Sequence, residues 1–386
     1  MTFSKKMQGF GASIFSALNE KKIERLKKGL PVYNLSIGTP DFKPEPHIMQ
    51  ALSEAALDPE NYKYAITDRD ELIAAVQGWY KRRYEVDLES SEIMSLYGSQ
   101  EGISRIFWAL TDPGDVILAP DPAYPIFAVG PDLCGARVEY YKLYAKNNFI
   151  LDFADIPEET ARKARAIVVS YPSNPVCTVA GDDFYRDLIR FAEKYDIVVI
   201  HDNAYSDIIF DGKTGKSFLS YPGAKDVGIE INSLSKSYNV TGVRVSFAVG
   251  NKEVIEKFRD LRSQVDYGLF LPVQKMAVAA LNGPQDSVKR NCAEYQRRRD
   301  ALCGGLRAAG MDIRDSEGTM FAWGKIPARY ENSEAFVLEL IEKTGVICVP
   351  GSGFGSQGEG FARFALVLPV PKINELIEVI KNSGVL

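Results

Sequence analysis

Short apolar runs alternate with amphipathic stretches through the middle of the chain. The runs are rich in valine and isoleucine, which is typical of strands buried on both faces of a parallel sheet. They predict strands at 92–96, 115–119, 136–140, 166–170, 197–201, 227–231 and 244–249. Between several of them lie stretches with helical spacing, such as 182–195, which follows a polar cap region at Gly181. This alternation predicts a mostly parallel sheet with helices on both faces.

The pattern changes after about residue 250, where longer amphipathic stretches predominate. Helices are predicted at 251–264, 272–282, 286–309, 333–343 and 371–382. Strands are predicted at 319–323, 346–349 and 361–367. This mixture is typical of a smaller α+β lobe, so we expect an α/β protein with a large and a small domain. The 386 residues are enough for two domains with a sizeable core.

Composition and charge disfavour several classes of partner. The net charge of −5 and the pI of about 5.4 argue against nucleic acid. No apolar run reaches the roughly 18 residues of a membrane span. Only His47 and His201 are available for a histidine-based metal site. The five cysteines are scattered without a C-x-x-C pair, which indicates reduced thiols in a cytoplasmic protein.

The stretch around Lys236 carries the strongest chemical signal. Ser233 and Ser235 precede this lysine, and Arg244 follows eight residues later. A lysine amine can condense with an aldehyde, serine hydroxyls can donate hydrogen bonds to a phosphate, and an arginine can bind the same phosphate with two N–H groups. Such a set would hold pyridoxal phosphate (PLP), a phosphorylated aldehyde. By itself a Ser-x-Ser-Lys string is more typical of a solvated loop, so the hypothesis depends on four further sites.

The first of these sites is Asn174, which lies between Pro172 and Pro175 after the predicted strand at 166–170. The two prolines stiffen the turn, so the asparagine projects from a rigid strand end. Its amide could donate to the phenolate oxygen of PLP. The alternative is a simple Asn-Pro turn.

The second site is Asp202, which ends the β-branched run at 197–201. The end of a strand is the usual place for ligand chemistry in an open α/β sheet. An ionised carboxylate there can keep a pyridine nitrogen protonated, which makes the ring a better electron sink. Tyr205 could donate its hydroxyl to the same phenolate oxygen as Asn174. The alternative for Asp202 is a helix N-cap.

The remaining two sites would complete the binding of phosphate and substrate. Ser99 and Gln100 follow Gly98 at the start of an apolar helical stretch, where backbone N–H groups can bind an anion. Tyr124 lies on the next strand-to-helix loop, and its ring could stack on the cofactor. Arg363 stands among apolar residues of a predicted strand and needs an anionic partner. That partner is either a substrate carboxylate or an internal Asp or Glu.

A glycine motif at 353–358 has a different interpretation. It matches G-x-G-x-x-G, the pattern of dinucleotide-binding loops. The predicted strand with Arg363 follows it in place of a helix, so the βαβ context of those loops is missing. We interpret the segment as a loop over the active site, with Phe354 as an apolar lid.

The candidate residues share their order and spacing with a known family. They resemble the functional residues of the class I/II aminotransferases, PLP-dependent enzymes of fold type I, at Asn174, Asp202, Tyr205, Lys236, Arg244 and Arg363. The resemblance extends from the stretch 35–42 to the strand with Arg363. The stretches most similar to LL-diaminopimelate aminotransferases and their relatives are 201–206, 222–228, 233–242 and 342–346. The resemblance implies a seven-stranded, mostly parallel sheet in a large domain.

The resemblance also implies a role for each candidate residue. Lys236 would be the Schiff-base lysine and the proton shuttle, and Asp202 would pair with the pyridine nitrogen. The phenolate oxygen would be held by Asn174 and Tyr205. The phosphate would be bound by Ser99, Gln100, Ser233, Ser235 and Arg244. Tyr124 would stack on the ring. The substrate would be bound by Gly38, Asn174 and Arg363, and the phosphate of the neighbouring subunit would be reached by Tyr64.

The implied enzyme is a cytoplasmic homodimer with active sites at the interface. It would move an amino group from an amino acid to a 2-oxo acid with ping-pong kinetics. Residues 40–270 would form the PLP-binding domain, and residues 1–39 with 271–386 a discontinuous small domain. The resemblance favours LL-diaminopimelate or an aspartate-like amino donor, but the residues themselves leave aromatic and aliphatic donors open.

Three other functions use the same kind of fold. A PLP-dependent C–S β-lyase shares the catalytic set and stays an alternative. A PLP-binding regulator would carry an appended DNA-binding domain, for which we expect no room before the segment with Gly38. A structural protein on an inactive fold is disfavoured by the intact set of candidate residues.

Two positions depart from the family pattern. Cys177 stands where the family's Asn-Pro-x-Gly motif has glycine, so the backbone there must accommodate a side chain. Around 68–72 a familiar glycine is missing and the loop looks one residue short. The second departure bears on the assignment of Tyr64 and on substrate preference.

Overall fold

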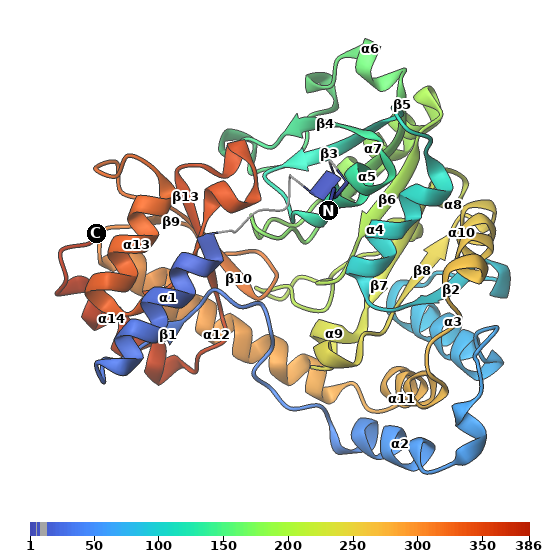
Figure 1. The fold of residues 1–386 in the computed structure, drawn as a ribbon, viewed down its shortest axis with the longest axis horizontal. Coiled ribbons are helices and arrows are strands. Elements are labelled where there is room, and N and C mark those ends of the chain that lie inside the picture. Colours follow the sequence, from blue (N-terminus) through green and yellow to red (C-terminus); the bar gives the residue numbers. More distant parts are fainter. Residues whose placement is uncertain (5, 8–13) are drawn as a thin grey trace.

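The computed structural model of the chain describes residues 1–4, 6–7 and 14–386. Residues 5 and 8–13 of the predicted segment 1–39 therefore lie outside the described residues. Figure 1 shows a large lobe around an extended sheet, with a smaller lobe of helices and short strands beside it. No helix in the described part of the chain is long and apolar enough to cross a membrane.

The large lobe contains a seven-stranded sheet. Across the sheet the strands are β2 (Ile93–Leu96), β8 (Ser246–Gly250), β7 (Gly228–Ser233), β6 (Val198–Asp202), β5 (Ala164–Ser170), β3 (Val116–Asp121) and β4 (Arg137–Lys142). β8 runs antiparallel to both neighbours, and the other neighbouring pairs are parallel. The predicted mostly parallel α/β fold is therefore confirmed. All strands except β8 end at the same edge.

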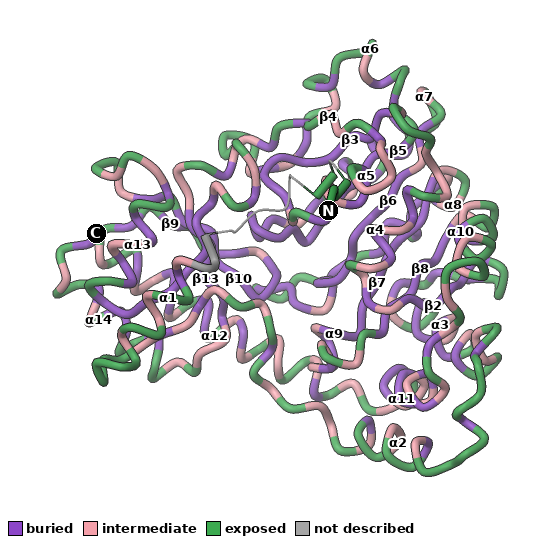
Figure 2. The backbone as a smooth tube through the Cα atoms, in the orientation of Figure 1, coloured by how far each residue is buried: buried purple, intermediate pink, exposed green. Residues whose placement is uncertain are grey.

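Alternate side chains of the strands enter two separate cores, because successive residues of a strand point to opposite faces. Ile200 of β6 lies in one core and Val199 in the other. The helices packed in the first core are α4 (Ser99–Leu110), α5 (Ile126–Cys134) and α10 (Lys252–Val265). The second core includes side chains of α3 (Asp70–Tyr84) and α7 (Asp182–Tyr195). Figure 2 shows the central strands as a buried layer between these helices.

The smaller lobe contains two further sheets. The first is antiparallel, in the order β12 (Val349–Pro350), β13 (Phe361–Ala365), β10 (Phe321–Lys325) and β9 (Asp312–Ile313). The second pairs β1 (Tyr33–Asn34) in parallel with β11 (Val346–Ile347), which joins the N-terminal segment to the C-terminal part of the chain. The helices of this lobe are α1 (Ile14–Lys27), α12 (Asp286–Ala308), α13 (Ser333–Thr344) and α14 (Val370–Lys381). Figure 1 shows α1 next to α13.

The remaining helices connect these parts. They are α2 (Pro46–Ala56), α6 (Glu158–Ala161), α8 (Ala224–Val227), α9 (Leu234–Ser237) and α11 (Leu271–Asn282). α11 packs against both α2 and α3 at the base of the large lobe. α9 is a single turn that directly follows β7 and contains Lys236.

The predicted strands differ from the observed ones by one or two residues at their ends, and three of these differences have a clear structural reason. The strand predicted at 244–249 begins at Ser246, because Arg244 has a φ of 60°, which strand residues do not adopt. The strand predicted at 319–323 begins at Phe321, after Thr319 with a φ of 71°. The strand predicted at 346–349 is two strands that pair in different sheets, β11 and β12. The predictions did not include α2 or α3.

Candidate active site

The candidate residues gather at one edge of the seven-stranded sheet. Asn174 follows β5, Asp202 is the last residue of β6, and Lys236 lies just after β7. Because β8 runs in the opposite direction, Arg244 precedes its start at the same edge. Open α/β sheets bind their ligands at the edge where parallel strands end. The topology therefore explains why residues so far apart in sequence meet.

A cavity of about 240 Å³ occupies this edge. Its lining includes all the predicted site residues of a single chain, namely Gly38, Ser99, Gln100, Tyr124, Asn174, Asp202, Tyr205, Ser233, Ser235, Lys236, Arg244 and Arg363. Tyr64 is the exception. It is 79% exposed, and its ring packs against Tyr267 with the ring centres 4.8 Å apart.

The cavity also has four lining residues that the sequence predictions missed: Thr39, Ala204, Thr241 and Phe321. Thr39 and Thr241 lie in stretches that the family resemblance had already connected with the site. Their closeness in sequence to predicted site residues was therefore the signal that could have identified them. Phe321 has no such signal, because a phenylalanine in a buried strand has the same pattern whether it faces a site or the core. A Cβ at Gly38 would come within 2.7 Å of the Phe321 ring, so the glycine allows this close approach.

Lys236 is a half-buried amine near two other cations, Arg244 and Arg363. Its Nζ donates to the carbonyl oxygen of Gly38 at 2.5 Å. Burial, and then the charges of Arg244 and Arg363, lower the pKa of Lys236 to about 8. A lowered pKa leaves more of the amine uncharged near neutral pH, and the uncharged amine is the nucleophile.

Asp202 has an unsatisfied oxygen. The residue is 7% exposed, and its Oδ1 has no hydrogen-bond partner among the described residues. Burial raises the pKa of Asp202 to about 6. A turn at 204–207 follows β6, so the helix N-cap explanation for this aspartate is wrong. A buried carboxylate oxygen needs a donor, and a protonated ring nitrogen is one that a ligand could supply.

Arg363 is a buried cation without a carboxylate partner in the described part of the chain. Its Nη1 donates to Asn174 Oδ1 at 2.8 Å and its Nη2 to the Ser36 carbonyl oxygen at 3.0 Å. Its Nε has no hydrogen-bond partner among the described residues. Burial lowers the pKa of Arg363 to about 10, so the guanidinium stays charged at neutral pH. The alternative that Arg363 forms an internal ion pair with Asp or Glu is therefore wrong. The positive charge of Arg363 is available to an anionic ligand.

Two aromatic rings hold the Arg363 guanidinium in place. Its Cζ lies 4.1 Å from the ring centre of Phe321 and 4.8 Å from that of Phe354. Phe354 belongs to the glycine-rich segment, which forms two short 3-10 helices, Gly351–Phe354 and Ser356–Gly358, before β13. The absence of an α-helix there agrees with our rejection of the dinucleotide motif. Phe354 is buried, and its ring contacts Arg363, the residue that is predicted to bind the substrate.

An anion site can form at the start of α4. Gly98 has a φ of 90°, and a Cβ on it would collide with the Arg244 guanidinium. Glycine therefore lets Arg244 lie against the helix start, where backbone N–H groups are free to bind an anion. Ser233 accepts a hydrogen bond from the Ser235 backbone N–H at 3.2 Å, which leaves the Ser233 hydroxyl proton for another acceptor.

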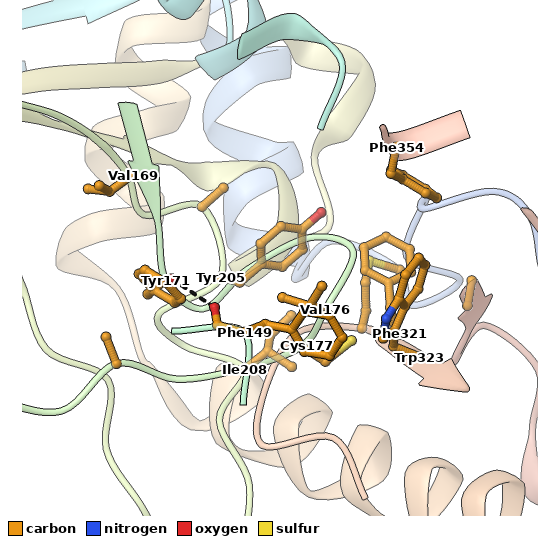
Figure 3. Close-up of a cluster of buried hydrophobic side chains, with 14 of the residues drawn as sticks. Phe149, Val169, Tyr171, Val176, Cys177, Tyr205, Ile208, Phe321, Trp323 and Phe354 are labelled. Atoms are coloured by element: carbon orange, nitrogen blue, oxygen red, sulfur yellow. Dashed lines mark hydrogen bonds between the residues drawn. The ribbon is translucent and has the colours of Figure 1, made fainter. Parts of the chain in front are cut away.

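Asn174 and Tyr205 supply two hydrogen-bond donors to the cavity, and Tyr124 supplies an aromatic ring. Because the Asn174 carbonyl oxygen accepts from Arg363, its amide group is left to donate. Figure 3 shows the Tyr205 hydroxyl pointing out of the apolar cluster that contains Val176 and Cys177. Burial raises the pKa of Tyr205 well above its ordinary value, so the hydroxyl keeps its proton. Tyr124 donates to Gln100 Oε1 at 2.9 Å, which fixes its ring at the cavity wall.

The two departures from the family pattern have clear local structures. Cys177 has a φ of 63°, the left-handed conformation that glycine adopts most easily, so the turn keeps a glycine-like shape despite the side chain. Its carbonyl oxygen accepts from the Glu317 backbone N–H at 3.1 Å. Asp68, in the short loop, accepts from the Ser95 backbone N–H at 2.7 Å and ties that loop to β2.

These features fit PLP. The cavity combines an amine of lowered pKa, a carboxylate oxygen without a donor, an anion site with an arginine and two serines, and a second buried arginine. The amine can react with the cofactor aldehyde, and the carboxylate oxygen can accept from the ring nitrogen. The anion site can bind the phosphate, and the second arginine can bind a substrate carboxylate. Among the described residues no cluster of three or more histidine, cysteine or acidic side chains could hold a metal ion.

Known proteins resemble this chain along nearly its whole length. The model of the family "Aminotransferase class I and II" matches residues 31–380. An LL-diaminopimelate aminotransferase from Dehalococcoides mccartyi is 42% identical over 384 residues, which cover 99% of each chain. Substrate-bound BacF from Bacillus subtilis has a TM-score of 0.95 at 31% identity and covers 100% of this chain and 98% of that one. A probable N-succinyldiaminopimelate aminotransferase from Thermus thermophilus has a TM-score of 0.91 at 32% identity, with 96% and 100% covered.

Two of these relatives are named as aminotransferases, which favours transamination over the C–S β-lyase alternative. The family match, the near full-length identity and the common fold agree with each other. The chain belongs to the class I and II aminotransferases and is a PLP-dependent transaminase.

Proposed function

We propose that this transaminase acts on LL-diaminopimelate and that the cavity around Lys236 is its active site. The substrate is supported by the 42% identity to an LL-diaminopimelate aminotransferase over 99% of both chains. One observation carries the site. The buried Arg363 charge has no carboxylate partner among the described residues, and it shares a cavity with the Lys236 amine and the unsatisfied Asp202 oxygen.

In this proposal each part of the cofactor has its own residues. PLP, when bound, supplies an aldehyde and an electron-withdrawing ring. Lys236 is its covalent attachment point, and Asp202 keeps the ring nitrogen protonated. Asn174 and Tyr205 donate to the phenolate oxygen, and Tyr124 packs on the ring. The phosphate is bound by Ser99, Gln100, Ser233, Ser235 and Arg244.

Lys236 also moves the proton that transamination requires. Its Nζ would take the proton from the substrate α-carbon and return it at another carbon, which is general acid–base catalysis. A pKa of about 8 suits both steps, because the amine can hold or release a proton near neutral pH. In the structure the Lys236 Nζ donates to the Gly38 carbonyl oxygen. The N-terminal segment that contains Gly38 therefore also orients this base. Because amino acid and 2-oxo acid use one site in turn, the kinetics are ping-pong.

Replacing Arg363 with lysine is expected to weaken substrate binding far more than cofactor binding. A lysine keeps the charge but loses the two parallel N–H groups that match a carboxylate, a pair worth roughly 1.5–3 kcal/mol as charged hydrogen bonds. The KM for both amino donor and 2-oxo acid should therefore rise at least about tenfold. Arg314→Lys, at an exposed residue outside the cavity, is the matched control. An unchanged KM for both substrates would contradict the role of Arg363.

The far carboxylate of diaminopimelate has no cation of its own among the described residues that line the cavity. The cations lining the cavity are Lys236, Arg244 and Arg363, and each already has a role. We therefore infer a homodimer with active sites at the interface, in which Tyr64 reaches the phosphate of the neighbouring subunit. Tyr64 is 79% exposed and its neighbours Tyr62 and Ile66 are 65% and 77% exposed, an apolar surface typical of a subunit interface.

Two further expectations belong to this proposal. The PLP-binding domain would be 40–270, and the small domain would combine 1–39 with 271–386. The pairing of β1 with β11 supports the second grouping, while α11, at the start of 271–386, packs on α2 and α3 of the large lobe. A cytoplasmic location is supported by five cysteines that form no disulfide.

The substrate proposal is tested by the half-reaction without acceptor. The PLP-loaded enzyme is mixed with LL-diaminopimelate, meso-diaminopimelate, aspartate, glutamate or tyrosine, and 2-oxo acid is measured within one turnover. LL-diaminopimelate should react at least about tenfold faster than tyrosine, since a site built for polar groups rejects analogues that lack them. A faster reaction with tyrosine or aspartate would reassign the substrate while leaving transamination intact.

A further inference from the structure

A second cavity, of about 680 Å³, shares no lining residue with the active-site cavity. It lies between α3, the loop 206–215 and the first half of α12, and we refer to it as the α3–α12 cavity. Its volume is within the range of roughly 300–1,000 Å³ typical of small-molecule sites. Nothing in the transaminase mechanism uses it.

The charge of the α3–α12 cavity is unbalanced. Arg82, Lys213 and Lys289 line it, and none of them forms an ion pair with another residue of the described ranges. The acidic side chain in its wall, Asp207, is already paired with Arg83 at 3.0 Å. Asp211, next in the same loop, binds Arg299 through both carboxylate oxygens. The cavity therefore has a surplus of cationic groups, which favours an anionic ligand.

The position of Arg82 is set by its own helix. Gly78 lies one turn earlier, and a Cβ on it would come within 2.9 Å of Arg82 Nη1. Arg82 Nη2 donates to the Leu281 carbonyl oxygen at 3.0 Å, so the guanidinium is oriented but keeps further donors for a ligand. Trp79 and Ile209 add apolar surface to the same cavity. Cationic groups around an apolar wall suit a small molecule with several anionic groups on a compact body.

Side chains that line this cavity accept hydrogen bonds from the end of α9, the short helix that contains Lys236. Ser237 donates to Asp207 at 2.6 Å, and Tyr238 donates to Gln285 Oε1 at 2.8 Å. These two donors directly follow Lys236 in sequence, and both acceptors line the α3–α12 cavity. Figure 1 shows α9 beside the start of α12, in agreement with these contacts. A ligand that competes with Asp207 for Arg83 would act on the segment that positions the catalytic lysine.

We propose that the α3–α12 cavity binds a small polyanion, with carboxylate or phosphate groups, and that its occupancy is transmitted through Asp207 to Lys236. The cationic groups bind the anion. The hydrogen bonds from Ser237 and Tyr238 carry the effect to α9. The proposal does not depend on the identity of the amino donor.

Calorimetric titration of the PLP-loaded enzyme tests the binding. The probes are benzene-1,3,5-tricarboxylate and inorganic pyrophosphate at low salt, and the one that binds more tightly identifies the anionic group. The triple variant Arg82→Gln, Lys213→Gln, Lys289→Gln should bind at least about tenfold more weakly, the sum expected of three exposed charge pairs. The matched control, Lys27→Gln, Lys252→Gln, Lys325→Gln, changes three exposed lysines outside the cavity and should bind as the wild type does. Equal affinity of both triple variants would overturn the site.

The transmission is tested by the absorbance of bound PLP. Saturation with the tighter probe should shift the pH midpoint of this absorbance in the wild type, and Asp207→Asn should retain binding but lose the shift. Arg83 then loses its ion pair with residue 207 and keeps its contacts with the Gly215 and Ser206 carbonyl oxygens. Saturation without any change in the wild-type midpoint would refute transmission to Lys236.

Discussion

Replacing Lys236 with alanine is expected to lower turnover by about 10⁴-fold or more, while PLP stays bound without a covalent link. General acid–base catalysis alone contributes up to about 10⁴-fold, and the variant also loses covalent attachment. The phosphate and ring contacts involve other side chains of the cavity, so the cofactor should still copurify. Steady-state turnover and the absorbance of the gel-filtered protein measure the two effects.

The control for this substitution is Lys252→Ala, an exposed lysine at the start of α10. It should retain wild-type turnover. Turnover near the wild-type rate in Lys236→Ala would exclude the lysine from catalysis. Loss of PLP together with activity would instead mean that attachment dominates cofactor binding, which would contradict the proposed phosphate site.

Replacing Asp202 with asparagine is expected to have opposite effects on catalysis and on the stability of the cofactor-free protein. An asparagine cannot stabilise a protonated ring nitrogen with a full charge, and loss of one such electrostatic contact typically costs about 10²–10³-fold in turnover. The same substitution should stabilise the cofactor-free protein at neutral pH, because it removes a buried carboxylate with no donor for its Oδ1 in the described chain.

The stability effect has a defined pH dependence. Burial raises the pKa of Asp202 from 3.8 to about 6, so the folded state holds this proton more tightly than the unfolded state does. The wild type therefore loses stability relative to the variant as the pH rises from about 4 through 6, by up to about 3 kcal/mol in total. Urea unfolding of both cofactor-free proteins at pH 4 and pH 7 measures this difference. An equal difference at the two pH values would contradict the raised pKa.

The central strands were predictable because burial on both faces leaves a simple pattern. β5 and β6 are runs of β-branched residues, and their predicted positions agree with the structure to within two residues. β8 and β10 were predicted to start two residues too early, since a positive φ at Arg244 or Thr319 leaves no mark in hydrophobicity. The division of 346–349 between two sheets depends on the partner strands, which the local sequence does not contain.

The candidate site was predictable where function requires unusual residues at strand ends. Lys236, Asp202 and Arg363 are polar side chains in apolar surroundings, and they meet because the sheet brings strand ends together. Phe321 was missed, since its contact with Arg363 is a tertiary property of an ordinary core residue. Tyr64 does not line the active-site cavity of its own chain, so its role stays a prediction that depends on the proposed homodimer.

The most direct test of the central claim is the identity of the residue that PLP modifies. The purified protein is loaded with PLP, reduced with sodium borohydride, digested and analysed by mass spectrometry, with and without prior exposure to the amino donor. One labelled peptide is expected, modified at Lys236, and its labelling should fall when the amino donor is added first. A label on another lysine, or none at all, would contradict the assignment of this cavity as the active site.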